Sequence, residues 1–465
     1  MKALISLLLA AVLAGCAAMD PGEPGIVQID AARLGLQQHE IDWPTDRWWT
    51  RYGDGQLNGL VDAALAGSPS MEAAHARLNA ANAAVRGARA VRLPQADAGL
   101  NVTRQRFSEN YIYPPPYGGS MLTDANLRLD VGLDLDLWGR NRSRFAAAVS
   151  NREAARADLE MARNTLVSAV VQSYYKLQNA LAQQAVLEDI ARQQQKVLDI
   201  TRERVGAGLD TRIEVRQAES AVASARVQWS QAGNNAQLLR NQLAALLGEG
   251  PERGSHIEPV VLDGMPARLP AVLPLELISR RPDLIAARER ALAATSQVSA
   301  AKAEFYPNVN LAAFAGFMSL GLDSLLQGGS KTYGVGPAVS LPIFHGGALN
   351  AQLDQRRADR DLAIADYNQT LLTAVRETAD AVASIQALED QARDQAESLQ
   401  AIGAAYQLAV DRYRSGLGNF IQVLLAQNEV QKQSILAADM RARAYELDAQ
   451  LATALGGGYL YPAKH

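Results

Sequence analysis

Four stretches of the chain alternate apolar and polar residues with a period of two, which is typical of strands with one apolar and one polar face. The clearest runs from Asn126 to Trp138, and Gln95 to Phe107 alternates less cleanly. A third set runs from Val309 to Phe317, and a fourth, from Val335 to Ile343, is interrupted by a proline. A loop rich in tyrosine and proline and a loop rich in glycine join them into two β-hairpins, whose strands approach the length of about ten residues that spans an outer membrane. A soluble sandwich fits less well, because two isolated hairpins would bury little.

Long helical segments follow each predicted hairpin. Asn141 to Arg204 contains neither proline nor glycine and would reach ~95 Å at ~1.5 Å per residue. Apolar residues in this segment, and again from Ile364 to Leu388, keep near-heptad spacing, which predicts left-handed coiled coils. Each long helix ends at a glycine-containing turn, with Asp210 or Thr211 and Asn419 as candidate caps of the returning helices. A plain structural rod is the alternative interpretation of such helices.

The two halves of the chain repeat one design. Four short motifs recur in the same order, roughly 206 to 213 residues apart, which indicates a duplicated unit. The pairs are Leu93-Pro94 with Tyr306-Pro307, Leu135 to Gly139 with Leu341 to Gly346, Arg204 to Leu209 with Arg412 to Leu417, and Ala244 to Gly248 with Ala452 to Gly456. Chance similarity among alanine-rich helices would explain the last of these pairs but not the ordered set.

The N-terminus carries an export signal. Met1-Lys2 is positively charged, Ala3 to Val12 is apolar but too short to span a bilayer, and small residues precede Cys16. This pattern resembles the lipobox of bacterial lipoproteins, in which cleavage leaves a cysteine that carries a lipid. Ala17, where some lipoproteins have aspartate, resembles the outer-membrane sorting pattern. An ordinary signal peptide with an incidental cysteine is the alternative.

Composition excludes several functions. The 465-residue chain has a net charge of -4, five scattered histidines and a single cysteine, so we expect no nucleic-acid binding, disulfide, metal site or cofactor other than lipid on Cys16. The sequence contains no stretch of 18 consecutive apolar residues, so it predicts no transmembrane helix. No zinc-protease motif, phosphate loop or nucleophile elbow is present, and the fragment Gly334-Val335-Gly336 is a strand glycine pair rather than a phosphate loop. We therefore expect that the protein is not an enzyme.

Nearly the whole mature chain resembles the TolC-like outer-membrane factor family, in its NodT-type lipoprotein branch. The resemblance rests on Asp46 to Asp54, on Leu277 to Leu284, on Ala300 to Asn308, on Tyr413 to Gly416 and on Ala454 to Gly458. It implies an α+β membrane protein: a trimer in which each chain gives four strands to a twelve-stranded β-barrel and its helices to a long periplasmic α-barrel. It also implies an outer-membrane efflux channel that receives cargo from a periplasmic adaptor and an inner-membrane pump, often of the resistance-nodulation-division class. A lipid-anchored periplasmic coiled-coil or adaptor protein is the alternative, although no compact β-rich domain is evident at the base of the helices.

These patterns divide the chain into nine segments. They are a signal peptide (1–15), an N-terminal extension and first helical segment (16–92), the first β-hairpin (93–138), the first helical hairpin (139–250), an equatorial segment (251–275), a helix (276–304), the second β-hairpin (305–344), the second helical hairpin (345–456) and a C-terminal tail (457–465).

The resemblance places a closed gate at the tips of the helical hairpins. Ile421 matches an apolar constriction position, whereas Gln422 and Leu425 stand where relatives often carry aspartate. Glu214 and Asp210 of the first repeat are the alternative source of negative charge, and packing within one protomer is the alternative role of Ile421 and Leu425. The adaptor is expected to contact the turns at Gly208, Leu209, Gly416 and Leu417. On the second strand, Asp130, Asp134 and Asp136 alternate with apolar residues, so we expect them to face the barrel lumen and favour cations.

Overall fold

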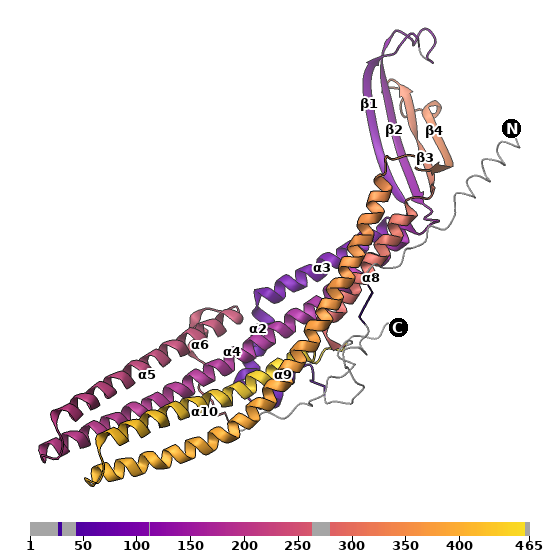
Figure 1. The fold of residues 1–465 in the computed structure, drawn as a ribbon. Helices are drawn as coiled ribbons and strands as arrows, with labels where there is room; N and C mark the ends of the chain where they lie inside the picture. The colour runs from indigo at the N-terminus through magenta and orange to yellow at the C-terminus, as the bar shows by residue number, and fades with distance from the viewer. Residues whose placement is uncertain (1–26, 30–42, 111, 263–279, 461–465) are drawn as a thin grey trace. The chain divides into compact units, whose positions relative to one another are not determined.

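The structure is a computed structural model that describes residues 27–29, 43–110, 112–262 and 280–460 (Figure 1). It divides into two compact units. The first comprises residues 1–28, 77–156 and 286–368, and the second comprises residues 29–76, 157–285 and 369–465. The expected signal peptide and Cys16 lie outside the described residues, as do Tyr111 in the first hairpin loop and part of the equatorial segment.

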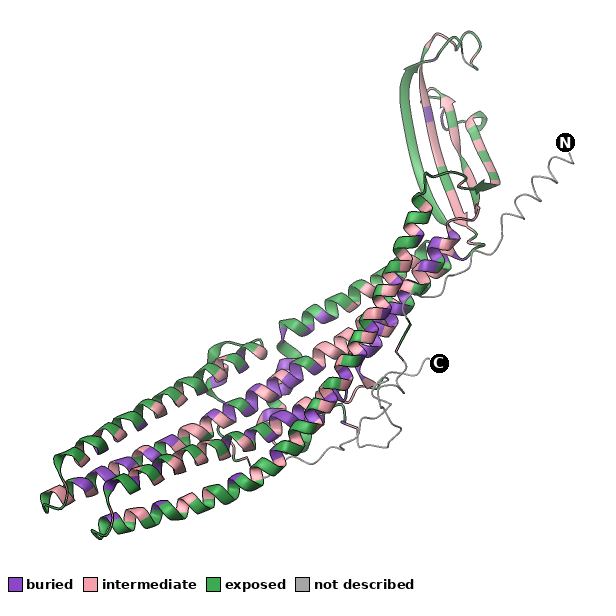
Figure 2. Ribbon diagram, in the orientation of Figure 1, coloured by how far each residue is buried: buried purple, intermediate pink, exposed green. Residues whose placement is uncertain are grey.

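A four-stranded antiparallel sheet lies in the first unit, in the order β1-β2-β3-β4. Its strands are β1 (Gln95–Arg106), β2 (Met121–Asp134), β3 (Asn308–Leu320) and β4 (Lys331–Ser340). The register places Leu129 of β2 beside Ala98 of β1 and Ala315 of β3, and the neighbouring rung places Asp130 beside Asp97 and Phe314. The alternation therefore gives one apolar sheet face and one face rich in polar and small residues, as the period of two predicted. β1 is exposed along its whole length (Figure 2).

Several strand bounds differ from the predicted ones, among them the ends of β2 and β4. β2 ends at Asp134 rather than at Trp138, and β4 ends at Ser340 rather than at Ile343. Asp136 has a φ of 47°, outside the extended region, so the chain turns there even though the alternation in the sequence continues. Trp138 then stacks on Tyr306 at 4.8 Å and donates from Nε1 to the carbonyl of Pro307 at 2.7 Å. Segments 135–139 and 306–307, which belong to two different recurring motifs, thus tie the end of β2 to the start of β3.

The long helices have matching lengths in the two repeats. α4 (Arg140–Gly206) and α9 (Ala348–Arg414) each contain 67 residues, and α5 (Arg212–Leu246) and α10 (Phe420–Ala454) each contain 35. This equality supports the duplication inferred from the recurring motifs. None of the described helices is long and apolar enough to cross a membrane.

Shorter helices complete the described chain. They are η2 (Trp48–Tyr52), α2 (Gly55–Gly67), α3 (Pro69–Ala90), α6 (Pro251–Ser255), α8 (Pro282–Ala303) and η3 (Gly328–Ser330). The main apolar core of the second unit joins η2 and α2 to α4, α5 and α10, with Trp48, Trp49 and Tyr174 almost fully buried. Arg51 forms a salt bridge with the buried Asp448 of α10. The segment Asp46 to Asp54 therefore anchors the N-terminal part of this unit to the long helices.

Candidate functional site

The turns of both helical hairpins are fixed by capping. Gly208 and Gly416 adopt positive φ values of 72° and 77°, which glycine accommodates at the end of a helix. Thr211 begins α5 with a capping box, in which its hydroxyl accepts from Ile213 N at 3.1 Å and Glu214 accepts from Thr211 N at 2.9 Å. Asn419 begins α10 by accepting from Gln422 N at 3.1 Å. Thr211 is thus the cap of α5, and the prediction of Asn419 is confirmed.

Three side chains join the two turns, and we call them the tip clasp: Arg204, Asp210 and Tyr413. Arg204 donates from Nε to Asp210 Oδ2 at 2.8 Å and from Nη1 to the carbonyl of Tyr413 at 2.8 Å. The Tyr413 hydroxyl donates to Asp210 Oδ2 at 2.5 Å, and the Arg204 guanidinium lies 4.5 Å from the centre of the Tyr413 ring. The side chains of Arg204 and Asp210 are only 11% and 12% exposed. The clasp therefore connects the first helical hairpin to the second through charge-assisted bonds that water reaches poorly.

The clasp shifts the ionisation of its own members. The bonds from Arg204 are the main cause of the lowered pKa of Asp210, and Tyr413 lowers it further. Burial, together with the bond to Asp210, raises the pKa of Tyr413 to about 12. Both shifts favour an ionised Asp210 and a neutral Tyr413 over the whole neutral range.

An apolar layer lies behind the tip clasp, and we call it the tip cluster. It takes two buried side chains from each long helix, so that all four helices meet in one core. Its members are Val197, Leu198, Ala218, Val222, Tyr406, Tyr413, Phe420 and Val423. The clasp and the cluster share Tyr413, which is 1% exposed, so breaking the clasp also loosens the packing of this layer.

The other predicted tip residues face outward. Leu209 and Leu417 are 63% and 73% exposed at the turns, and Ile421 and Leu425 of α10 are 59% and 64% exposed. The last two side chains are therefore mostly exposed in the described part of this chain, which gives little support to packing within one protomer as their role. The Glu214 carboxylate accepts a hydrogen bond from the backbone N–H of Thr211, and Asp210 forms a salt bridge with Arg204. Asp210 was expected as a source of negative charge, but its charge is balanced within the clasp.

The three predicted lumen aspartates separate into two groups. Asp130 lies on the polar face of β2 and accepts from Arg128 Nε at 2.7 Å, while the Arg128 guanidinium lies 4.0 Å from the centre of the Phe314 ring. Asp134 pairs with Arg140 at 2.6 Å, and the carboxylate of Asp136 accepts from the backbone N–H groups of Asn141 and Arg142 at 2.8 Å each. The expectation that Asp136 continues the strand face is wrong, because this carboxylate caps the start of α4. Asp134 and Asp136 hold the turn between strand and helix.

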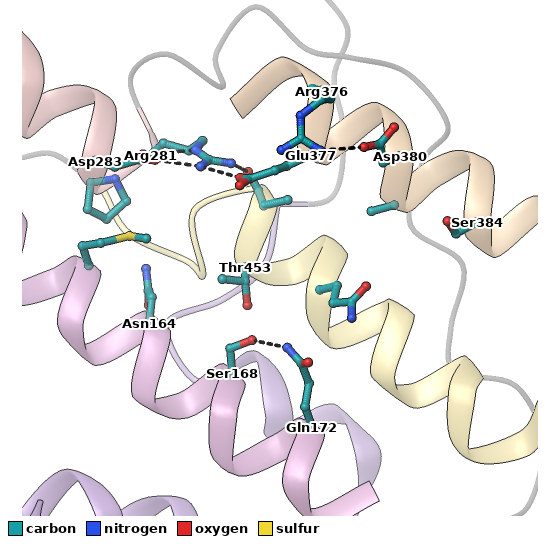
Figure 3. Close-up of a pocket in the computed structure, with 15 residues that line it drawn as sticks. Asn164, Ser168, Gln172, Arg281, Asp283, Arg376, Glu377, Asp380, Ser384 and Thr453 are labelled. Carbon is teal, nitrogen blue, oxygen red and sulfur yellow. Dashed lines mark hydrogen bonds and ion pairs between the residues drawn. The ribbon is translucent and has the colours of Figure 1, made fainter. Parts of the chain in front are cut away.

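A pocket of about 380 Å³ in the second unit is lined by Arg281 and Asp283, which belong to the motif Leu277 to Leu284 (Figure 3). Arg281, 6% exposed at its side chain, donates to Asp283 at 2.7 Å, to Glu377 of α9 at 2.8 Å and to the carbonyl of Ala454 at 3.0 Å. Asn164 of α4 donates to the carbonyl of Gly456 at 2.8 Å. A side chain on Gly456 (φ 97°) would collide with the backbone of Arg280, so the glycine run is required for this close approach. The paired guanidinium gives this cavity a structural role, joining α8, α9 and α10.

Sequence reasoning did not identify Arg204 and Tyr413 as site residues, although both belong to the recurring motifs. Both lie shortly before a turn glycine, but the repeat aligns Arg204 with Arg412 and Tyr413 with Val205, so the repeat gave no signal that joins the two residues. Within the described chain, no group of three or more histidine, cysteine, aspartate or glutamate side chains is arranged to hold a metal ion.

Comparison with known proteins agrees with this architecture of paired helical hairpins and a small amphipathic sheet. A profile of the outer membrane efflux protein family matches residues 60–249 and 273–457. The multidrug resistance outer membrane protein MdtP of Escherichia coli O6:H1 is 33% identical over 431 residues, covering 90% of this chain and 87% of MdtP. The fusaric acid resistance protein FusA of Burkholderia cepacia is 34% identical over 366 residues, covering 77% of this chain and 69% of FusA. The crystal structure of VceC, an outer membrane protein of Vibrio cholerae, superposes with a TM-score of 0.84 at 35% identity, covering 90% of this chain and all of VceC.

The fold and these relatives define an outer-membrane channel of the efflux type. The chain belongs to the outer membrane efflux protein family. It is the outer-membrane channel component of an efflux system and has a large periplasmic part. Members of this family are channels and not enzymes, which agrees with the absence of catalytic motifs from the sequence.

Proposed function

We propose that three copies of this chain form one conduit, closed at rest by the hairpin tips and open to small molecules when a partner separates them. The observation that carries the proposal is the tip clasp, in which Arg204 and Asp210 of one helical hairpin hold Tyr413 of the other. Bonds of this kind between two otherwise parallel hairpins keep them together at one end. Their loss would let the hairpins part without unfolding either one.

The sheet supports assembly from several copies. Its order leaves one edge of β1 and one edge of β4 without a hydrogen-bonded neighbour among the described strands. Unpaired strand edges are not tolerated in lipid, so a sheet in the outer membrane must close on further strands. Four strands from each of three copies would give the twelve-stranded barrel. The apolar face would then contact lipid, and Asp130 and Arg128 would line the lumen.

The hairpin tips are the proposed contact with a periplasmic adaptor. Leu209 and Leu417 are apolar and exposed beside Gly208 and Gly416, as at a surface that a partner covers. Ile421 and Leu425, exposed in one copy, would meet their counterparts around the channel axis and narrow the entrance. An inner-membrane pump of the resistance-nodulation-division class would deliver the cargo through that adaptor. MdtP and FusA are named for resistance to drugs and to fusaric acid, which supports small organic molecules as the cargo.

Planar-bilayer recording of the detergent-extracted protein tests this function. We expect discrete channels of low resting conductance, together with a particle mass three times that of the chain by light scattering. A protein that inserts but never conducts, even after the tip clasp is disrupted, contradicts the proposal.

A further inference from the structure

Gln427 of α10 is a buried amide without a polar partner. The residue is 2% exposed, and neither its Oε1 nor its Nε2 has a hydrogen-bond partner among the described residues. Two other buried glutamines of the long helices have partners: Gln178 accepts from Val260 N at 2.8 Å, and Gln395 donates to the carbonyl of Gln433 at 2.8 Å. Buried polar groups are nearly always paired, so this exception calls for a physical reason.

The residue occupies a core position of the coiled coil. Phe420, Val423, Gln427 and Val430 follow the spacing of three and four residues that marks the buried seam of a helix. Phe420 and Val423 belong to the tip cluster, and Val430 packs against it. A polar side chain therefore interrupts the apolar seam directly behind the tip clasp. Its amide is desolvated whenever the four helices are packed together.

The first repeat has no such feature. Counted from the cap residues Thr211 and Asn419, the matching position of α5 is Glu219. Glu219 is 35% exposed at its side chain and pairs with Arg202 and Arg216 at the surface. The unpaired amide thus belongs to the second hairpin alone, the hairpin that also carries Ile421 and Leu425.

We propose that Gln427 is a conformational device that biases the tip toward opening. Desolvating an amide without a new hydrogen bond is unfavourable, and water would satisfy both atoms once α10 separates from its neighbours. The tip clasp and the tip cluster then stabilise the closed tip, and Gln427 destabilises it. The free energy that a partner must supply to open the tip is lower as a result. This inference rests on the proposed gate. A buried polar residue that only fixes helix register, as in some coiled coils, is the competing role.

Gln427→Met tests the device, because methionine nearly preserves the shape and removes the unpaired amide. The variant should be made in the wild type and in Tyr413→Phe, and each trimer should be recorded in planar bilayers and melted in detergent. We expect a higher melting temperature in both backgrounds. We also expect the resting open probability of the Tyr413→Phe channel to fall on the order of tenfold. Gln427→Leu serves as the second variant if Gln427→Met fails to assemble, and Gln407→Leu, at an exposed position of α9, is the matched control that should leave both measurements unchanged.

Four results would overturn the inference. A raised melting temperature with unchanged open probability assigns Gln427 to helix register alone. A lowered melting temperature means that the amide is stabilising where it lies. A Tyr413→Phe channel that conducts no more than the wild type overturns the proposed gate, and this inference with it, whereas a Tyr413→Phe channel that opens but does not respond to Gln427→Met overturns the inference alone.

Discussion

The hydroxyl of Tyr413 donates a hydrogen bond to Asp210 at 2.5 Å, although the two residues are 203 positions apart in the sequence. Arg204 completes this contact by pairing with Asp210 and covering the tyrosine ring. The two turns of a duplicated chain are thereby joined by one carboxylate from the first repeat and one phenol from the second. Duplication of a unit does not by itself require a bond between the two copies. The tip clasp is therefore an additional interaction that fixes how the two hairpins lie against each other at their turns.

The tip clasp should withstand moderate changes of pH. Because the folded-state pKa of Asp210 is lowered from 3.8, its contribution is complete above pH 3.8 and is lost only as the pH falls through the still lower folded value. The raised pKa of Tyr413, about 12, means that its contribution is complete below pH 10 and is lost as the pH rises through about 12. We expect the clasp's contribution to the closed state to be constant between pH 5 and pH 9, as measured by the effect of Tyr413→Phe on resting conductance. A marked loss of that effect between pH 7 and pH 5 would contradict the assignment.

Removing the apolar side chains beside the tip should open the entrance. Ile421→Ala combined with Leu425→Ala shortens two exposed side chains that are not part of the buried core of the single chain. We expect normal trimers with raised resting conductance and greater uptake of large antibiotics by cells that lack the pump. Leu408→Ala, at a position of α9 that is 65% exposed, is the control. If the double variant trimerises and conducts as the wild type does, the constriction lies elsewhere.

The sequence predicted regular elements better than contacts between them. Period-two and heptad patterns depend on which face of one element is buried, so the four strands and the 67-residue helices could be found from local spacing alone. The end of β2 could not be found in this way, because Leu135 and Leu137 continue the alternation while Asp136 turns to cap α4. The tip clasp could not be predicted from the sequence either, because the period of the apolar residues does not indicate which two turns lie side by side.

The polar face of β2 should contribute to ion selectivity through Asp130 and less through Asp136. Three copies of Asp130 would add negative charge to the lumen, although Arg128 offsets part of it. Asp130→Asn should therefore lower the preference for cations, measured as the reversal potential across a salt gradient. Asp136→Ala should leave selectivity nearly unchanged and lower the melting temperature instead, because it removes the cap of α4 at a cost of about 0.5–2 kcal/mol. Anion preference in the wild type, or equal effects of the two variants on selectivity, would count against this division.

Cys16 should carry a lipid. The residues before it resemble a lipobox, and it is the only cysteine of the chain. Metabolic labelling with a radioactive fatty acid should mark the wild type and not Cys16→Ala, whereas Cys16→Ala should still form channels because the strands carry the insertion. Equal labelling of both proteins would contradict lipidation at this site.

The resting conductance of Tyr413→Phe tests the account most directly, with Tyr406→Phe as its matched control. Both tyrosines are buried in the tip cluster on α9, but only Tyr413 donates to Asp210. A hydrogen bond to a charged group contributes about 1.5–3 kcal/mol, and each copy in the trimer would lose one. We predict that Tyr413→Phe raises the resting open probability in planar bilayers by at least about tenfold, while Tyr406→Phe conducts as the wild type does. A Tyr413→Phe trimer that stays as closed as the wild type, or a Tyr406→Phe trimer that opens equally, would contradict the claim that the tip clasp holds the channel shut.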